Sequence, residues 1–267
     1  MKACIAQFRS TWEDPHENLR RARAQVEEAA SRGADLICFP EQFLTGWSPD
    51  AARHAEGLDG PLVQEMREMA ATSRIHLLGA VTEQGLPKPR NTCLAIGPQG
   101  QILATYTKTH LFTPGGEHLH FCPGDRIATF SVGTCRCGIA ICYDLRFAPL
   151  FRLYALLGVH CMLVPAAWPC RRMPAWDALV AARAVEIQGY VQGTTTTGKT
   201  PVEEYCGGSL AADPNGRIIA RAGTGEELVV VEVDPDAADA LRRRIPVQQD
   251  FRPDLYHRLM QEGDRRP

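Results

Sequence analysis

Apolar and polar positions follow two patterns that take turns along the 267-residue chain. Short runs of about four to eight apolar residues are typical of buried strands, and apolar residues that recur every three or four positions are typical of helices. Strands are predicted at 1–8, 35–40, 75–81, 91–96, 102–107, 127–132, 136–141, 161–165, 190–195, 208–212, 217–222 and 228–233, and helices at 15–32, 61–73, 143–157, 174–188 and from 235 onward.

Local signals support several of these boundaries. Asp14 is suited to cap the first helix, and Gly33 is a stop signal at its end. The apolar run at 35–40 lacks polar alternation, which indicates a strand buried on both faces. Because strands and helices alternate with no low-complexity linker, the pattern predicts one α/β domain over residues 1–267, ending in an irregular tail at about 245–267.

Composition narrows the class of protein. Hydrophobic residues make up 45% of the chain and charged residues 22%, as in ordinary globular proteins. The net charge of −2 argues against a nucleic-acid partner, which would favour a basic surface. We expect the one dense basic run, Arg242-Arg243-Arg244, to form a solvated helix face or a subunit contact.

The pattern predicts neither a membrane span nor a secretion signal. No apolar stretch approaches the roughly 20 residues that a bilayer requires, and the N-terminal run becomes polar too early for a signal peptide. We therefore expect a cytoplasmic protein whose ten cysteines are reduced thiols. There is no Cys-x-x-Cys spacing, and Cys135 and Cys137 are expected to face the same side of a sheet, so neither a metal nor another cofactor is predicted.

Glu41, Lys108 and Cys142 each follow a predicted strand. In open α/β sheets the carboxyl ends of the strands border the crevice where ligands bind. Taken singly, the three residues are adequately explained as a loop carboxylate, a surface charge and a buried thiol. Taken together, they supply the base, the cation and the nucleophile that the hydrolysis of an amide requires.

The chemistry assigns each of these residues a role. A free thiol has a pKa of about 8.5, so Cys142 needs a base at neutral pH before it can attack. Glu41 is suited to take the thiol proton and pass it to departing ammonia. Lys108 offers positive charge to the oxyanion of the tetrahedral intermediate, and the backbone N–H of Tyr143, at the start of a predicted helix, offers a second donor.

Three segments resemble the signature blocks of the nitrilase superfamily of carbon–nitrogen hydrolases. They are Phe39-Pro40-Glu41, Lys108-Thr109-His110-Leu111-Phe112 and the run from Gly138 to Phe147, and the likeness continues to 252–256. The resemblance implies a four-layer α-β-β-α sandwich, a Glu–Lys–Cys triad and an acyl-enzyme. It also implies that subunits pair through their helical layers, as a homodimer or a larger homo-oligomer.

The resemblance implies a fourth active-site residue. Glu117 stands six residues before Pro123, as the second active-site glutamate of the superfamily does. It would orient Lys108 and tune Glu41 through its charge. The neighbouring histidines, His118 and His120, are interpreted as loop or packing residues, because two histidines without a third ligand make a weak metal site.

The segments 167–176 and 182–188 are similar to the branch that contains omega-amidases and the deaminated-glutathione amidase. That similarity implies a small amide substrate bearing a carboxylate, such as 2-oxoglutaramate, and the release of ammonia. An arginine recognises a carboxylate well through two parallel hydrogen bonds. Arg172 is the candidate, and Arg171 is the alternative if the loop register differs by one.

Other residues are expected near the substrate or the nucleophile. Phe43, Tyr143 and Trp168 are candidates for an apolar pocket wall, with a core position as the alternative for Trp168. The run 194–197 consists of threonines where the family usually has an asparagine-bearing segment, which predicts a hydroxyl-rich wall. Asp144 and Arg146 are expected to hold the corner after the nucleophile through an ion pair or hydrogen bonds.

Several alternative functions stay open at the level of sequence. A carbamoylase would release carbon dioxide together with ammonia, and a deaminated-glutathione amidase would act on a different acidic amide. A nitrilase is disfavoured by the residues around the cysteine. A metal-dependent amidohydrolase and a catalytically idle scaffold of the same fold are further alternatives; the intact Glu41, Lys108 and Cys142 argue against the scaffold.

Overall fold

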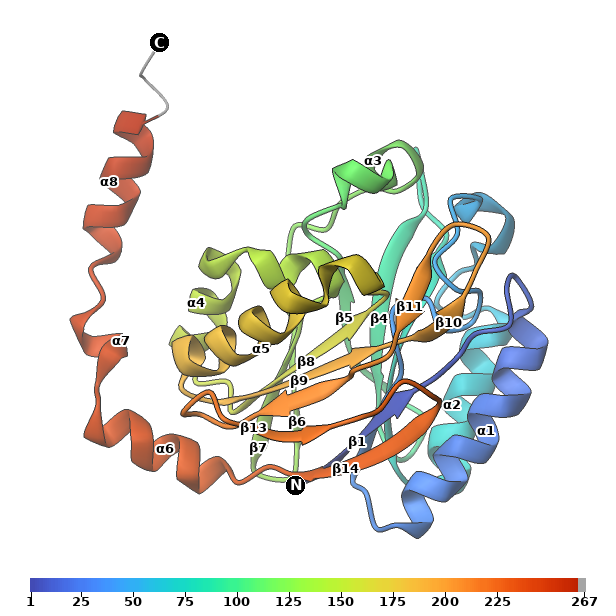
Figure 1. Cartoon of the computed structure of the whole chain (residues 1–267), viewed down its shortest axis with the longest axis horizontal. Coiled ribbons are helices and arrows are strands. Elements are labelled where there is room, and N and C mark those ends of the chain that lie inside the picture. The colour runs from blue at the N-terminus through green and yellow to red at the C-terminus, as the bar shows by residue number, and fades with distance from the viewer. Residues whose placement is uncertain (264–267) are drawn as a thin grey trace.

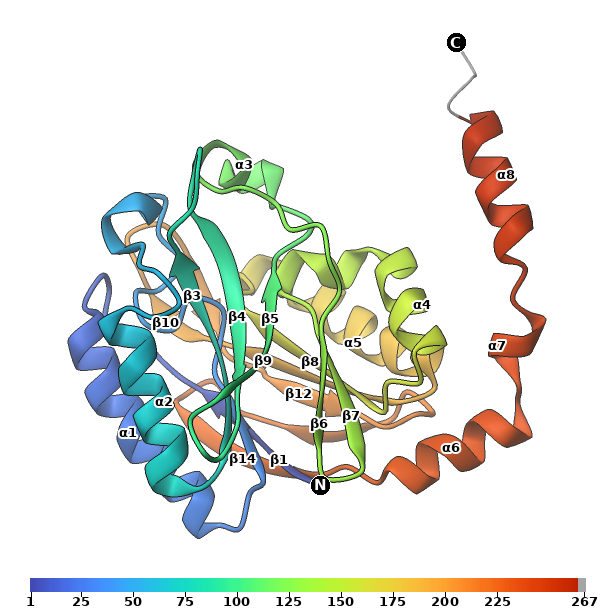
Figure 2. The same cartoon turned by 180° about the vertical axis from the view of Figure 1, so that it is seen from behind.

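Two six-stranded sheets pack face to face, and a pair of helices covers the outer face of each (Figure 1, Figure 2). The structure is a computed structural model of the chain and describes residues 1–263. The arrangement is the four-layer α-β-β-α sandwich that the resemblance to the nitrilase superfamily implies. None of the helices in the described residues is long and apolar enough to cross a membrane.

The first sheet has the strand order β14-β1-β2-β3-β4-β5, with two helices, α1 (Pro15–Ser31) and α2 (Pro61–Ser73), on its outer face. β1, β2 and β3 are parallel to one another, and β4 is antiparallel to both β3 and β5. As a result β2, β3 and β5 all end at the same edge. The strands are β1 (Lys2–Gln7), β2 (Leu36–Cys38), β3 (His76–Glu83), β4 (Arg90–Ile96), β5 (Ile102–Thr107) and β14 (Glu227–Glu232).

The second sheet has the order β13-β12-β9-β8-β7-β6, covered by α4 (Ala148–Leu156) and α5 (Met173–Ile187). β7, β8 and β9 are parallel, so their carboxyl ends also share one edge. The strands are β6 (Thr129–Val132), β7 (Cys135–Ile139), β8 (Cys161–Ala166), β9 (Tyr190–Thr195), β12 (Leu210–Ala212) and β13 (Ile218–Arg221).

Cap chemistry and apolar spacing explain where α1 begins and how it packs. Asp14 accepts a hydrogen bond of 3.1 Å from the backbone N–H of Glu17, and Pro15 occupies the first turn, where its missing N–H costs nothing. The helix buries Leu19, Ala22, Val26 and Ala29 against the first sheet.

Cysteines contribute to the core on both sheets. Cys38 and Cys93 of the first sheet and Cys135, Cys137 and Cys161 of the second are all buried in one apolar cluster. Cys135 and Cys137 lie on the same face of β7, as predicted from their spacing. Eight cysteines are free, but Cys170 and Cys206 form a disulfide bond, so the expectation of ten reduced thiols is wrong for this pair.

One expectation about secondary structure needs correction, and the structure adds short elements that were not predicted. The segment after Cys142 is not one helix: a 3-10 helix, η3 (Cys142–Arg146), precedes α4. A small hairpin of β10 (Thr197–Lys199) and β11 (Glu204–Cys206), not foreseen, forms a two-stranded sheet of its own. The loop at 109–125 holds η2 (Thr113–Gly115) and α3 (Glu117–His120), and η1 (Ala51–His54) lies between β2 and α2.

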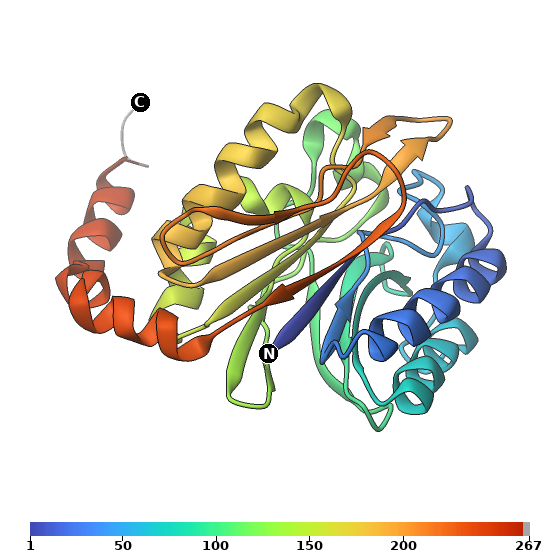
Figure 3. The same cartoon turned by 60° about the horizontal axis from the view of Figure 1, so that its bottom comes forward.

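The C-terminal segment is helical rather than irregular up to residue 263, and residues 264–267 of the predicted tail lie outside the described part. After α6 (Pro235–Arg244) come α7 (Val247–Asp250) and α8 (Pro253–Gly263), which extend away from the two sheets (Figure 1, Figure 3). Within the basic run, Arg242 donates hydrogen bonds to the carbonyls of Val159 and Ile187 and so fastens α6 to the body, while Arg243 and Arg244 are exposed.

Candidate active site

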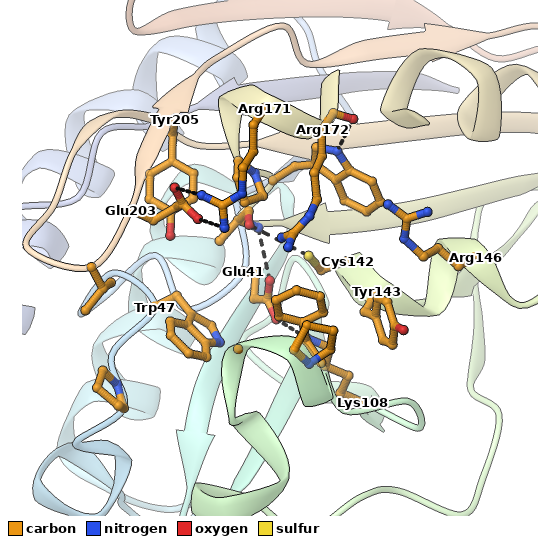
Figure 4. A pocket seen from close by; sticks show the side chains of 18 residues that line it. Glu41, Trp47, Lys108, Cys142, Tyr143, Arg146, Arg171, Arg172, Glu203 and Tyr205 are labelled. Carbon is orange, nitrogen blue, oxygen red and sulfur yellow. Dashed lines mark hydrogen bonds and ion pairs between the residues drawn. The ribbon is translucent and has the colours of Figure 1, made fainter. Parts of the chain in front are cut away.

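Residues from both sheets meet at one pocket of about 290 Å³ (Figure 4). Glu41 follows β2, Lys108 follows β5 and Cys142 follows β7, and all three line the pocket. β2 and β5 belong to the first sheet and β7 to the second. The packing of the two sheets therefore brings together the three residues that the sequence singles out.

Lys108 is buried between two carboxylates. Its Nζ lies 2.7 Å from Glu41 Oε1 and 2.8 Å from Glu117 Oε2. Burial by itself would lower the pKa of Lys108, but the carboxylates of Glu117 and Glu41 outweigh it and raise that pKa well above its usual value. Lys108 is consequently a fixed positive charge beside the pocket.

Hydrogen bonds hold both carboxylates in place. Asn91, on β4, donates through Nδ2 to Oε1 of Glu41 at 2.8 Å and to Oε1 of Glu117 at 3.2 Å. The other oxygen of Glu117 accepts from the backbone N–H of Phe112 at 2.6 Å, and that of Glu41 accepts from the backbone N–H of Ala167 at 3.0 Å. Every oxygen of the pair has a donor, which fixes the orientation of both groups.

Cys142 stands at a sharp bend after β7. Its φ of +48° lies in the left-handed region, which residues other than glycine seldom adopt and which recurs at functional sites. The buried Asp144 supports the bend by accepting hydrogen bonds from the backbone N–H of Ile141 at 2.9 Å, the hydroxyl of Tyr106 at 2.7 Å and the backbone N–H of His110 at 2.9 Å. The bend turns the thiol into the pocket (Figure 4).

The surroundings of the thiol favour its neutral form. Burial and the carboxylate of Glu41 raise the pKa of Cys142 well above its usual value, and the opposing effect of Lys108 is smaller. The carboxylate of Glu41 is close enough to raise the pKa of the thiol, and the sulfur lies 3.9 Å from the carbonyl oxygen of Ala167. Cys142 therefore rests protonated, with a carboxylate in position to accept its proton.

Arginines line the same pocket (Figure 4). Arg171 pairs with Glu203 at 2.7 Å, whereas Arg146 and Arg172 form no ion pair within residues 1–263. The guanidinium of Arg172 lies 4.5 Å from the ring centre of Phe112, in a cation–π contact. The pocket thus offers two unpaired positive groups near the buried thiol.

Comparison with known proteins agrees with this geometry. A family model described as carbon-nitrogen hydrolase matches residues 2–243. The chain belongs to the carbon–nitrogen hydrolase family. It is therefore an enzyme that hydrolyses carbon–nitrogen bonds, and it has the fold of the nitrilase superfamily.

Relatives of this carbon–nitrogen hydrolase cover nearly all of the chain. An omega-amidase of Mus musculus is 36% identical over 90% of this chain and 91% of its own length. A 2-oxoglutaramate amidase of Bacillus subtilis is 32% identical over 95% of this chain and 98% of its own length. A solved structure of a superfamily protein of Xanthomonas campestris, with an arsenic adduct in its active site, has a TM-score of 0.89 and 29% identity, covering 94% of this chain and 97% of that one.

Phe43 does not reach the pocket of this hydrolase. Its ring is fully buried on the other side of the first sheet, stacked on Phe39 at 4.6 Å between ring centres and edge-on to Phe8. The structure therefore places Phe43 in the core under α1 and α2 rather than in the pocket wall.

The predicted hydroxyl-rich wall is also absent from the pocket. Thr196 donates to the carbonyl of Phe8, and Thr195 accepts from the backbone N–H of Trp168. None of the four threonines at 194–197 lines the pocket, because their buried hydroxyls bond within the protein.

Tyr143 and Trp168 do line the pocket, together with aromatic residues that the sequence did not single out. Trp168 combines both of its expected positions, since it is 2% exposed and its indole N–H donates to the carbonyl of Arg172 at 2.9 Å. The aromatic residues not foreseen are Trp47, Phe112 and Tyr205.

Three polar residues were missed or assigned differently. The sequence offers only a weak sign that Asn91 belongs to the site: it is a polar residue at the start of an apolar strand. Arg146 was expected to hold the corner after Cys142, but it is exposed, lies over the ring of Trp168 and lines the pocket, so Asp144 alone has that structural role. Glu203 follows a polar loop and had no sequence signal.

In residues 1–263, no cluster of three or more His, Cys, Asp or Glu residues is placed to bind a metal.

Proposed function

We propose that the enzyme is a cysteine-dependent amidase that hydrolyses the terminal amide of a small carboxylate-bearing substrate of the 2-oxoglutaramate type. The observation that carries the proposal is the joint position of Glu41, Lys108 and Cys142 in one pocket with the unpaired Arg172. The names of the omega-amidase and 2-oxoglutaramate amidase relatives support the same class of substrate.

In the first half of the reaction, Glu41 takes the proton of the Cys142 thiol as the sulfur bonds to the amide carbon. The carbonyl oxygen becomes an oxyanion, which the ammonium of Lys108 and the backbone N–H of Tyr143 stabilise. When the tetrahedral intermediate collapses, the C–N bond breaks and Glu41 gives its proton to the leaving nitrogen. Ammonia departs and a thioester on Cys142 remains.

In the second half, water replaces ammonia. Glu41, again ionised, takes a proton from a water molecule that attacks the thioester carbon. The same donors stabilise the second oxyanion, the C–S bond breaks, and the proton returns to the sulfur of Cys142. Asn91 donates to Glu41, and Glu117 accepts from Lys108; neither residue bonds to Cys142, so their role is to position the base and the cation.

The carboxylate of the substrate would bind to Arg172. Arg171 is already neutralised by Glu203, which leaves Arg172 as the better of the two candidates. Burial and the neighbouring Arg171 both lower the pKa of Arg172, and an incoming carboxylate would offset both effects. Arg146, also unpaired, is a second cation near the same end of the pocket.

Replacing Arg172 tests the substrate class. For Arg172→Ala we expect KM for 2-oxoglutaramate to rise by about 10- to 100-fold, because a charge-assisted pair is worth about 1.5–3 kcal/mol. KM for a neutral amide of the same length should change little. Ammonia release is measured with both substrates, and with an N-carbamoyl compound of similar size to test the carbamoylase alternative.

Arg171→Ala is the matched control, since it removes a neighbouring arginine that is already paired. Equal losses on the acidic and the neutral amide in Arg172→Ala would refute the carboxylate clamp. If the wild type turns over the N-carbamoyl compound faster than 2-oxoglutaramate and releases carbon dioxide, the proposed function is wrong and the enzyme is a carbamoylase.

A further inference from the structure

The disulfide between Cys170 and Cys206 joins two separate segments of the pocket wall. Cys170 begins η4 (Cys170–Arg172), whose two arginines line the pocket. Cys206 ends β11, beside the lining residues Glu203 and Tyr205. Figure 4 shows Arg171 and Glu203 facing each other between the same two segments.

The hairpin of β10 and β11 lies outside both large sheets; apart from the disulfide, the hydroxyl of Thr197 donates to the carbonyl of Thr224, and Tyr205 is buried. Its strands pair only with each other and join neither six-stranded sheet, and an isolated two-stranded hairpin is only marginally stable. The ion pair of Arg171 with Glu203 also links it to η4, but the Arg171 side chain is 62% exposed, so this pair contributes little. The disulfide is thus the firmest connection between hairpin and η4.

The hairpin places two side chains, Glu203 and Tyr205, in the pocket wall, where they affect how the substrate is recognised. Glu203 neutralises Arg171 and so leaves Arg172 as the unpaired arginine of η4. The ring of Tyr205 is 5% exposed and closes the pocket wall on the hairpin side. A hairpin that moved away would take both groups with it and would free the charge of Arg171.

We propose that the Cys170–Cys206 disulfide is a positioning element for substrate specificity: it holds Glu203 and Tyr205 against η4 so that Arg172 meets the carboxylate of an acidic amide. The inference rests on the proposed function, because it assumes that a carboxylate binds at this end of the pocket. The reacting groups are not involved, since Glu41, Lys108 and Cys142 are held by the two large sheets.

The bond is open to reduction in the folded enzyme. Cys206 is exposed and Cys170 is half-buried, and exposed disulfides exchange more readily than buried ones. A dithiol such as dithiothreitol transfers two electrons and two protons to the bond, which yields two protein thiols and the oxidised cyclic reagent. Cys142 is already a free thiol and is unchanged by this treatment.

The test compares the enzyme as isolated, the same enzyme reduced by dithiothreitol, and the double variant Cys170→Ser/Cys206→Ser. Thiol alkylation after denaturation should count eight free cysteines before reduction and all ten of the chain after it. We expect reduction and the double variant each to raise KM for 2-oxoglutaramate about tenfold, with kcat within about twofold and little effect on a neutral amide. Cys122→Ser, which removes a free and partly buried thiol, should leave all values unchanged.

The outcomes separate this inference from the proposed function. If Arg172→Ala raises KM for the acidic amide but reduction does not, the positioning role is refuted and the clamp stands. If neither change distinguishes acidic from neutral amides, the proposed substrate class fails as well. Ten free thiols in the enzyme as isolated would also overturn the inference, and reduction of the wild type gives an answer even if the double variant does not fold.

Discussion

Asn91 is the residue that touches both carboxylates flanking Lys108. It is fully buried on β4, and its Nδ2 is shared between Glu41 and Glu117. Two carboxylates and one ammonium leave this buried group one negative charge in excess if all three are ionised. A neutral donor between the carboxylates offsets part of their mutual repulsion without adding a titrating group.

Replacing Asn91 should reduce catalysis more than binding. For Asn91→Ala we expect kcat to fall about 10- to 100-fold with KM little changed, because the base and its cation lose a positioning donor. The free energy of unfolding should also fall, by about 1–3 kcal/mol. Steady-state kinetics and urea unfolding measure the two effects. Thr92→Ala is the control, since it removes the neighbouring hydrogen bond to Glu83; unchanged kcat in Asn91→Ala would assign Asn91 to stability alone.

At the scale of elements, the agreement between sequence and structure depends on the strength of the local signals. β5, β9 and α2 begin and end where the sequence predicts, because each has a clear period or turn at its ends. The hairpin of β10 and β11 was missed because its three-residue strands are polar and too short to show a period.

The candidate site divides in a similar way. Glu41, Lys108 and Cys142 were predictable because they follow strands, whose carboxyl ends border ligand sites, and because their segments resemble the signature blocks of the nitrilase superfamily. Asn91 lies within a strand and Arg146 on a short 3-10 helix, where sequence does not reveal which way a side chain points. The disulfide depends on contact between residues 36 positions apart, on a short 3-10 helix and a three-residue strand, which no local pattern records.

The loop that follows α3 packs closely against the end of β5, at Gly124. A Cβ atom on Gly124 would lie 2.3 Å from the carbonyl oxygen of Thr107, and the backbone N–H of Gly124 donates to the carbonyl of Lys108 at 2.9 Å. A side chain here would therefore push on the strand end that carries Lys108.

For Gly124→Ala we expect a loss of about 1–3 kcal/mol in the free energy of unfolding, as for other overpacked positions, together with a lower kcat. Denaturant unfolding and ammonia release measure these changes. Gly225→Ala is the matched control, because a Cβ there meets no atom within 4 Å. Equal behaviour of the two variants would show that the loop yields without moving Lys108.

At the scale of the whole molecule, the two sheets share one core, and we propose that they fold as a single domain. Apolar side chains nevertheless stay exposed on the helical layer: Leu153 and Leu156 of α4 are 49% and 48% exposed, and Leu157, directly after the helix, is 41% exposed. The extended α8 also exposes Leu259 and Met260, and its hydrogen bonds and ion pairs stay within residues 252–263. We propose that a second copy of the chain covers these surfaces.

Sedimentation analysis tests this assembly. The wild type should have at least twice the mass of one chain, and Leu153→Glu/Leu156→Glu should shift it to the monomer, because two charges would be buried without partners. Leu103→Glu, at an exposed leucine of β5, is the control and should leave the assembly unchanged. A wild type that sediments as a monomer at all concentrations would contradict the proposal.

The central claim is that Cys142 forms a covalent acyl-enzyme with the substrate. Rapid quenching during turnover of 2-oxoglutaramate, followed by mass spectrometry of the intact protein and its peptides, tests it most directly. The account predicts a mass increase equal to the substrate less ammonia, located on the peptide that contains Cys142, and neither adduct nor ammonia release in a folded Cys142→Ala variant. Ammonia release at an undiminished rate from Cys142→Ala would contradict it.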